Sequence, residues 1–372
     1  MNNFNYEKLP EKKDFCGRKS ESKLLKAFIL DGKNVVIFGD RRYGKTSLIE
    51  HCFRDLNKTG PLYAFSDLFS CTTSLDVAVE IYKAVYKALP FNIEQTMKEF
   101  KRIFSRMTLE IKTGETGIKA SPKLNSRDFD ELLADALLGA DRICEKHGKK
   151  MVIALDEFQQ IAELDDKNID AVFRQYMQRL KHVSFIFSGS KKSILSGLFI
   201  DKKKPLYNMA SSIEVGGLEV NTFYKYCNKR LHREMAKKDF DHLYERVRGQ
   251  TKLILQVCWW LNISEQDTCP IAANEVQETL DMLIDEKHSE FKLIFNALTS
   301  LQRKAIKFMV NQPPSVAFFD ANTLHEARLT RQQLSQSLKA LIANATVDKI
   351  GTGIYRLNDV YFGLWCHKNI KM

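Results

Sequence analysis

Long apolar runs are missing from the 372-residue sequence. No stretch approaches the 18 consecutive apolar residues that a transmembrane helix needs. The first 15 residues also have no apolar segment of the kind found in a secretory signal. We therefore expect a cytoplasmic protein that has no membrane partner.

Paired cysteines and sequence repeats are missing as well. The eight cysteines are scattered, with no Cys-x-x-Cys pair. This pattern favours reduced thiols over a disulfide framework or a zinc site. No internal repeat or low-complexity tract is visible, which argues against a repeat architecture. A chain of 372 residues has room for two or three domains with cores of their own.

Acidic residues are too few to balance the basic ones. The chain has 57 Lys and Arg residues against 46 Asp and Glu residues, a net charge of +11. This charge favours anionic partners, with nucleic acid ahead of an anionic membrane surface.

Short apolar runs alternate with helical patterns over the first 217 residues. Such runs are typical of buried strands, and strands separated by helices form a parallel sheet covered on both faces. We therefore predict an α/β fold with a parallel-sheet core, and a hairpin inserted at 108–121. The predicted strands are 35–38, 61–68, 151–155 and 183–187, and the predicted helices are 46–56, one from about 74, 126–148 and 168–181.

A phosphate-binding motif follows the first predicted strand. Residues 39–46 read GDRRYGKT and match G-x-x-x-x-G-K-[ST]. In this motif backbone N–H groups and a helix N-terminus face phosphate oxygens, and the strand before it and the helix after it are both predicted here. Lys45 would reach the β- and γ-phosphates, and the Thr46 hydroxyl would bind Mg²⁺. The predicted nucleotide-binding residues are Gly39, Asp40, Arg41, Arg42, Tyr43, Gly44, Lys45, Thr46 and Ser47.

Two carboxylates end the strand at 151–155. A carboxylate at the end of a buried strand is costly unless it faces a cation or solvent. We predict that Asp156 holds Mg²⁺ and that Glu157 polarises the attacking water. The alternative is that the pair only caps the next helix.

Serines end the next predicted strand, in the segment FIFSGSKKS. A hydroxyl there can contact the γ-phosphate or position the water. Ser190 is the first candidate and Ser188 the second, against an ordinary Ser- and Gly-rich turn.

These segments resemble the archaeal-type ATPases of the AAA+/STAND group, which are similar in layout to origin-recognition-type initiators. The resemblance rests on FCGRKSESKLLKAF (15–28), GDRRYGKTSL (39–48), ALDEFQQI (154–161), FSGSKKSIL (187–195) and YRLNDVYFGLW (355–365). It implies an AAA+-like P-loop ATPase domain over 1–217, a helical lid over 218–290 and a winged helix over 291–372. It also implies that Arg18 lies near the nucleotide, whereas the residue could instead only begin a helix.

The chain departs from the family pattern in two places. Asn208 and Met209 stand in KPLYNMA where relatives often have Gly and Arg, so an arginine that would serve a neighbouring subunit is missing. GQTKLIL (249–255) replaces a Gly-x-Pro turn in the lid. There Lys252 is either a cationic lid sensor or a solvated lysine.

The last 82 residues carry an excess of basic side chains. Residues 329–344 read as a helix capped by Thr330, preceded by a shorter helix at about 320–327 and followed by a hairpin around 351–353. This order is typical of a winged helix-turn-helix, whose second helix enters the major groove. The candidate DNA-binding residues are Arg331, Gln332, Gln336 and Lys339. A winged helix can also dock on protein.

We therefore expect a Mg²⁺-dependent, ATP-binding ATPase that acts as a switch on double-stranded DNA. The alternative is a slow signalling switch that acts on a protein partner or on a second copy of itself. A metabolic kinase is disfavoured because the chain shows no acceptor-binding motif. The guanine signature N-K-x-D is missing, which favours adenine.

Overall fold

The computed structural model describes residues 4–56, 60–89, 107–114, 117–124, 128–165, 168–190, 192–264, 269–312, 318–319, 324–325 and 329–370. The chain forms two compact units. We call Glu11–Gly39 with Lys45–Val215 the sheet unit, and Met1–Pro10 with Asp40–Gly44 and Gly216–Met372 the helical unit.

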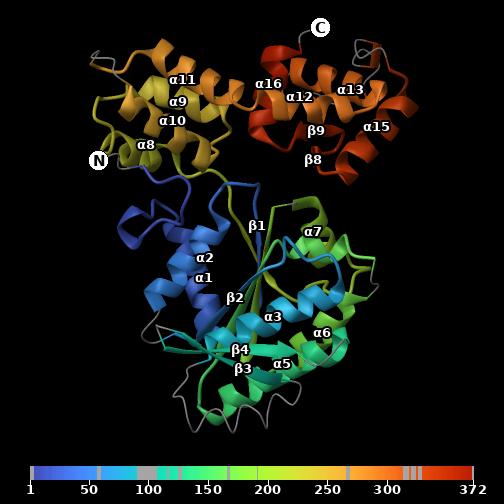
Figure 1. Cartoon of the computed structure of the whole chain (residues 1–372). Helices are drawn as coiled ribbons and strands as arrows, with labels where there is room; N and C mark the ends of the chain where they lie inside the picture. The colour runs from blue at the N-terminus through green and yellow to red at the C-terminus, as the bar shows by residue number, and fades with distance from the viewer. Residues whose placement is uncertain are drawn as a thin grey trace. The chain divides into compact units, whose positions relative to one another are not determined.

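The sheet unit is built on five parallel strands in the order β2-β5-β6-β1-β7 (Figure 1). The central strands β5 and β6 are buried at every position, as expected for a parallel sheet covered on both faces. The α/β prediction is confirmed. The strands are β1 (Val35–Phe38), β2 (Leu62–Asp67), β5 (Met151–Asp156), β6 (Val183–Gly189) and β7 (Ser211–Glu214).

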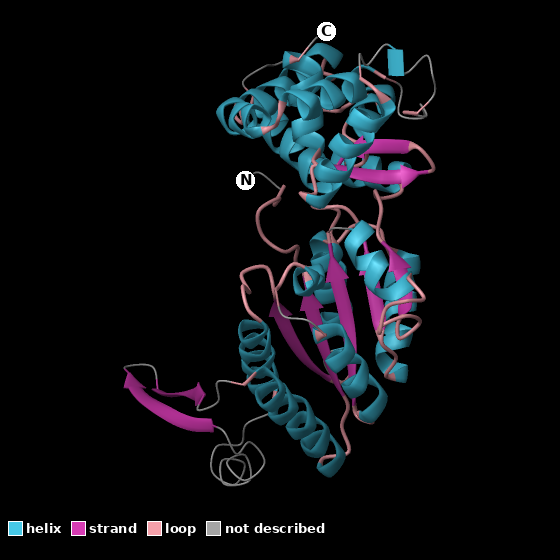
Figure 2. Ribbon diagram, turned by 90° about the vertical axis from the view of Figure 1, so that its right-hand side faces the viewer, coloured by secondary structure: helices cyan, strands magenta, loops and turns pink. Residues whose placement is uncertain are grey.

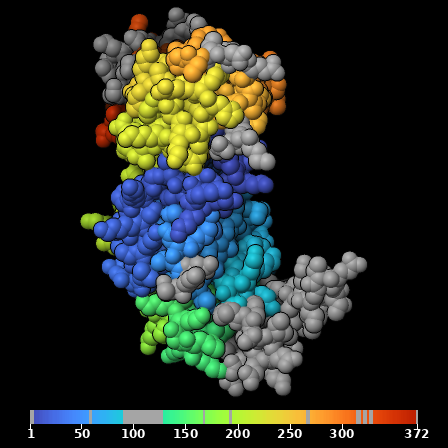
Figure 3. All heavy atoms as spheres, turned by 90° about the vertical axis from the view of Figure 1, so that its left-hand side faces the viewer, coloured from blue at the N-terminus to red at the C-terminus, as the bar shows by residue number. Residues whose placement is uncertain are grey.

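Helices cover both faces of this sheet (Figure 2). On one face Phe185 and Phe187 of β6 join a single core with residues of α3, α5, α6 and α7, while the alternate residue Ile186 points to the other face. The helices α1 and α2 pack together, and α2 contacts β6; both lie at the surface in Figure 3. The helices are α1 (Lys19–Asp31), α2 (Lys45–Leu56), α3 (Ser74–Ala88), α5 (Phe129–Lys146), α6 (Ile169–Arg179) and α7 (Lys192–Ile200).

Three further features of the sheet unit can be compared with the sequence. The predicted hairpin is present as antiparallel β3 (Met107–Gly114) and β4 (Gly117–Leu124). Strand β7 was not predicted, because SSIE is short and has only one buried residue; it is held by its pairing with β1. Helix α5 was predicted from 126; Asp128 caps it by accepting two backbone N–H groups.

The helical unit contains eight helices among its described residues and a two-stranded hairpin (Figure 1). Helices α9 and α10 are separated by a turn in which Arg248 adopts the left-handed conformation, at φ 54°. The elements are α8 (Val220–Asn228), α9 (Lys237–Arg246), α10 (Thr251–Ile263), α11 (Ala273–Asp285), α12 (His288–Ala297), α13 (Ser300–Asn311), α15 (Arg331–Ala343), β8 (Val347–Gly351), β9 (Ile354–Leu357) and α16 (Val360–Asn369).

The end of the chain matches the predicted order in part. Thr330 forms a capping box with Gln333 at the start of α15, and β8 pairs with β9 as the expected hairpin. Helix α16 was not predicted; its Trp365 packs against Phe291 and Phe295 of α12. The shorter helix predicted at about 320–327 falls almost entirely outside the described residues. The division into a lid and a winged helix stays a prediction.

Two expectations about composition can be compared with the structure. No disulfide joins any of the eight cysteines, all of which lie in described parts of the chain. Within the described ranges, none of the helices is long and apolar enough to span a membrane.

Candidate functional site

The two ends of the phosphate-binding motif lie in the sheet unit, between β1 and α2. Only glycine fits at position 39, because a Cβ there would lie 2.4 Å from the carbonyl oxygen of Val215. Lys45 opens α2 and is 6% exposed, with Nζ donating to the Gly39 carbonyl oxygen at 2.8 Å. An ammonium group this deeply buried needs negative partners. Thr46 and Ser47 follow in the first turn of α2.

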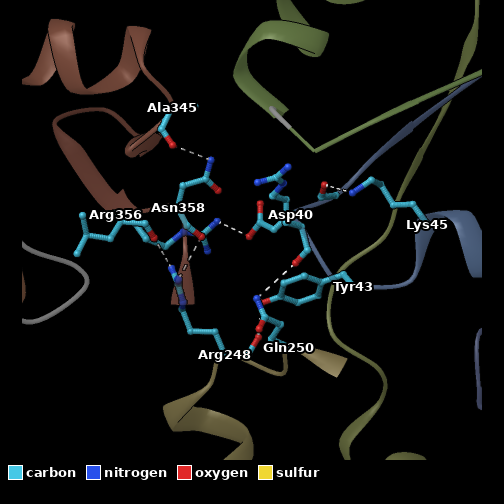
Figure 4. A network of polar contacts seen from close by, with 11 residues as sticks. Asp40, Tyr43, Lys45, Arg248, Gln250, Ala345, Arg356 and Asn358 are labelled. Atoms are coloured by element: carbon cyan, nitrogen blue, oxygen red, sulfur yellow. Dashed lines mark hydrogen bonds and ion pairs between the residues drawn. The ribbon is translucent and has the colours of Figure 1, made fainter. Parts of the chain in front are cut away.

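The middle of the motif, Asp40–Gly44, belongs to the helical unit. Figure 4 shows how it is held there: the Tyr43 hydroxyl donates to the Arg248 carbonyl oxygen at 2.7 Å, and Asp40 pairs with Arg356 at 2.8 Å. Arg248 in turn donates to the Leu357 carbonyl oxygen at 2.9 Å. Burial raises the pKa of Tyr43 and lowers the pKa of Arg248.

Both motif arginines are engaged by the same unit. The Arg41 carbonyl oxygen accepts from Gln250, and that of Arg42 accepts from the Lys252 backbone N–H, both at 3.4 Å. The Arg42 guanidinium lies 5.1 Å from the ring centre of Tyr361 and 3.8 Å from the Asp359 carboxylate. The segment 40–43 is therefore bound by the start of α10, by β9 and by the start of α16.

The loop turns through backbone conformations that favour glycine. Gly44 has φ 87°, and Arg42 has φ 68° although it carries a side chain. A non-glycine residue in this region is uncommon and costs free energy, so the surrounding contacts must hold it.

At the carboxyl edge of the sheet, two hydroxyl groups converge on Asp156. This residue ends β5 and is 8% exposed. Its Oδ2 accepts from the Thr46 hydroxyl and its Oδ1 from the Ser188 hydroxyl, each at 2.6 Å. The structure thus brings together three residues that the sequence singled out separately.

Glu157 and Ser190 also lie together. Glu157 adopts the left-handed conformation at φ 51°, and its Oε2 accepts from the Ser190 hydroxyl at 2.8 Å. Oε2 also accepts from Nε2 of Gln159, a residue that the sequence reasoning missed. The glutamine follows the predicted carboxylates by two positions, but a sequence does not show which way such a side chain turns.

A third carboxylate was missed at the end of β2. Asp67 is the register neighbour of Asp156 on β5. Partial burial raises the pKa of Asp67, and the charges of Asp156 and Glu157 raise it further. The signal was available, since Asp67 lies at the end of a predicted strand.

Arg18 lies at the N-cap position of α1. It is 8% exposed, has φ 57° and forms an ion pair with Glu21 at 3.1 Å. This placement is consistent with the alternative that Arg18 begins a helix; its predicted place near a nucleotide stays a prediction.

The four candidate DNA-binding residues share one surface of the helical unit. All four are exposed on α15, and the Arg331 guanidinium lies 5.8 Å from the ring centre of Phe319. They line an open groove of about 640 Å³ together with two further side chains; the lining residues are Phe319, Arg331, Gln332, Ser335, Gln336 and Lys339.

The described parts of the chain hold no group of three His, Cys, Asp or Glu residues that could bind a metal ion. A divalent ion at Thr46 and Asp156 would therefore need further oxygen ligands from water or from phosphate, as Mg²⁺ usually does.

Comparisons with known proteins show the family and the fold of the chain. The model of a family described as an ATPase domain predominantly from Archaea matches residues 15–257. The structure of the Walker-type ATPase paby2304 of Pyrococcus abyssi is similar, with a TM-score of 0.62, 16% identity, and coverage of 97% of this chain and 99% of that one. No curated protein matches the sequence.

Two structures from Aeropyrum pernix are also similar. The ORC2 protein in its ADPNP–ADP complexes has a TM-score of 0.58 at 13% identity, over 96% of this chain and 95% of that one. The ORC1 protein in complex with DNA has a TM-score of 0.51 at 12% identity, over 95% and 93%. At these identities the likeness shows a common fold.

Proposed function

The chain belongs to the family of ATPase domains found predominantly in Archaea, and we propose that it is a nucleotide-controlled switch acting on DNA. In this proposal ATP is bound and hydrolysed with Mg²⁺, and the nucleotide state changes how the C-terminal block engages a duplex. One observation carries the proposal: the middle of the phosphate loop belongs to the same compact unit as that block.

The side chains of the sheet unit suit a magnesium–triphosphate group. The buried Lys45 ammonium is matched to the β- and γ-phosphates, and in this motif the backbone N–H groups of the loop would bind phosphate oxygens. The Thr46 hydroxyl and the Asp156 carboxylate, 2.6 Å apart, are the hard oxygen ligands that Mg²⁺ prefers. When bound, Mg²⁺ neutralises charge on the phosphate oxygens.

Glu157 is the proposed general base. Water attacks the γ-phosphorus, its proton passes to the Glu157 carboxylate, and the bond from that phosphorus to the β,γ-bridging oxygen breaks so that ADP leaves with the electron pair. The bond with the Ser190 hydroxyl holds the base, and Ser188 holds Asp156.

The proposed coupling runs through residues 40–43. A bound triphosphate would draw the loop amides toward it and would change the environment of the Asp40 carboxylate. Asp40 pairs with Arg356 on β9, and Arg42 faces Asp359 at the start of α16. A shift in the loop would therefore change these contacts with the C-terminal block.

The groove on α15 is the proposed DNA-binding surface. Arg331 and Lys339 would contact phosphates, and Gln332 and Gln336 would reach base edges. The positive charge of the chain and the resemblance of the block to a winged helix support this assignment. The similar ORC1 structure is a complex with DNA.

A second candidate function is favoured by the segment KPLYNMA. Asn208 and Met209 replace the Gly and Arg often found in relatives, which favours slow turnover in a switch that acts on a protein partner. This alternative predicts nucleotide binding, slow hydrolysis and no affinity for DNA.

A salt-dependent DNA-binding assay tests the proposal. We expect the full chain to shift a duplex at low salt, with an affinity that falls steeply with salt concentration and differs between ADP and ATP. The variant Arg331→Ala/Lys339→Ala should weaken binding by roughly tenfold or more, because two phosphate contacts are lost.

A charge-matched control separates the groove from the net charge. Lys23→Ala/Lys87→Ala removes two exposed lysines from α1 and α3 in the sheet unit and should bind DNA like the parent. Absence of any shift would reject DNA binding and favour the protein-partner switch. Equal losses in both variants would show that binding follows the net charge and would reject the groove as the binding surface.

A further inference from the structure

Gln159 is a buried polar residue whose side-chain amide contacts the proposed base Glu157. It lies in the short 3-10 helix Phe158–Ala162 after β5 and is 3% exposed. Its neighbour Phe158 anchors the turn in the core against Phe173 and Phe187, while the Gln159 side chain turns toward Glu157.

The orientation of the amide is fixed by chemistry. An ionised carboxylate only accepts hydrogen bonds, so the group that faces Glu157 Oε2 must be the Nε2 donor. Oε2 also accepts from the Ser190 hydroxyl at 2.8 Å and from the Ser190 backbone N–H at 3.4 Å. In the part of the chain that the structure describes, all side-chain and backbone donors to this carboxylate go to Oε2, and Oε1 receives none.

The oxygen of the Gln159 amide destabilises the folded protein. Gln159 Oε1 is buried and receives no hydrogen bond from the described residues. A buried acceptor left without a donor typically costs about 1–3 kcal/mol, so an apolar side chain would serve packing better. The site retains the amide at that cost.

Gly189 makes the room that this amide occupies. A Cβ at position 189, the last residue of β6, would lie 1.9 Å from Gln159 Oε1 and 3.1 Å from its Cδ. The amide therefore lies against the backbone of β6, directly before Ser190, which supplies the other donors. The ends of β5 and β6 together form a clamp on one oxygen of Glu157.

We propose that Gln159 is a positioning residue that, with Ser190, fixes Oε2 of Glu157 so that Oε1 takes the proton of the attacking water. The inference rests on the proposed role of Glu157 as general base. With Oε2 held by three donors, Oε1 keeps its lone pairs for the reaction. The left-handed backbone of Glu157 is held in place by the same bonds.

Single-turnover kinetics and equilibrium binding test the clamp. Gln159→Met keeps the length and packing of the side chain but removes the donor. We expect kcat to fall by about tenfold to a hundredfold, a part of the 10²–10⁴ that a general base contributes, with the Kd for Mg-ATP changed less than about threefold. A purely structural role would lower kcat, raise the Kd for Mg-ATP and lower the unfolding midpoint together, and that result would overturn the proposal.

Gln160→Ala is the matched control. Gln160 is the adjacent glutamine, and its Nε2 donates to the Cys71 carbonyl oxygen at 3.3 Å instead of to Glu157. Its kcat should stay within about twofold of the parent, because only a peripheral hydrogen bond is lost. A loss equal to that of Gln159→Met would show a general effect on the turn and would contradict the clamp.

A double-mutant cycle between Gly189, the last residue of β6, and Gln159 also tests the clamp. Gly189→Ala should displace the amide and lower kcat about as much as Gln159→Ala does. The double variant should be no slower than Gln159→Ala alone, because the displaced group is already gone. If the two losses in kcat instead multiply in the double variant, the two residues act independently, and the inference is overturned.

Glu157→Gln, measured in parallel, separates this inference from the proposal beneath it. If Glu157→Gln hydrolyses ATP at the parent rate, the proposed base itself is wrong. If that variant is inactive while Gln159→Met keeps the parent kcat, only the clamp is wrong.

Discussion

The residues in and around the phosphate-binding motif are held in two chemically different ways. In the sheet unit, hydroxyl groups and one amide donate to carboxylates: Thr46 and Ser188 donate to Asp156, and Ser190 and the amide of Gln159 donate to Glu157. In the helical unit, guanidinium groups, a phenol and backbone carbonyls bind residues 40–43 (Figure 4). The first set consists of hydroxyl, amide and carboxylate groups, to which the proposed function assigns metal binding and proton transfer. The second consists of groups that hold the conformation of residues 40–43. In the proposed function, chemistry and signalling therefore depend on separate side chains.

Lys45→Ala should have the largest effect on nucleotide binding, because in the proposed function this lysine neutralises the β- and γ-phosphates. We expect Mg-ATP affinity to fall by at least about a hundredfold, roughly 2.7 kcal/mol. Titration calorimetry measures the affinity, and a thermal melt with millimolar nucleotide supports it. As a control, Lys23→Ala removes an exposed lysine of α1 and should bind Mg-ATP like the parent. Unchanged heat of binding in Lys45→Ala would contradict the assignment.

Glu157→Gln should affect the sheet-unit chemistry alone. We expect hydrolysis to fall by about 10²–10⁴-fold with ATP binding retained, since the amide cannot accept the water's proton. Phosphate release under single-turnover conditions gives the rate. Hydrolysis at the parent rate would show that another group is the base.

Arg356→Ala should affect the helical-unit contacts. Asp40 would lose its 2.8 Å partner and would repel the triphosphate, weakening Mg-ATP binding by about five- to tenfold, roughly 1 to 1.4 kcal/mol. Asp40→Asn in the same chain should restore affinity. Lys368→Ala breaks the exposed pair with Asp285 in the same unit and should change nothing. A loss that Asp40→Asn fails to restore would remove Asp40 from the coupling.

Asp67→Asn should have the smallest effect, on stability. The pKa of Asp67 is raised in the folded protein, so the folded state binds its proton more tightly than the unfolded state does. Its contribution is therefore favourable at low pH and is lost as pH rises through the titration range of the carboxyl group. We expect the unfolding midpoint of Asp67→Asn to match the parent near pH 4 and to exceed it by about 1–2 °C at pH 7.

The control for this effect is Glu145→Gln, an exposed carboxylate on α5. It should give the same difference from the parent at both pH values. A pH-independent gain in Asp67→Asn would show that the charge of Asp67 is not the cause.

The sequence was sufficient where local pattern decides the structure. The strands predicted at 35–38 and 151–155 are continuous apolar runs, and Thr330 precedes α15 with the spacing of a capping box, so these features are visible locally. Asp156 was predictable because a carboxylate at the end of such a strand needs a cation or a donor.

The remaining contacts depend on distant parts of the chain. Asp40 and Arg356 are separated by 316 positions, so no local pattern pairs them. Gln159 reaches Glu157 only because the left-handed turn at 157 and the missing side chain at Gly189 open a place for it. Strand β7 was missed because four residues with one buried side chain carry little periodic signal.

The path of the chain between the two units also limits how this protein can be recombined with its relatives. It passes from the sheet unit into the helical unit for Asp40–Gly44 and then returns. A chimera that took only residues 216–372 from a relative would present foreign partners to Asp40 and Tyr43. A functional exchange must therefore carry five residues of the phosphate loop along with the C-terminal half.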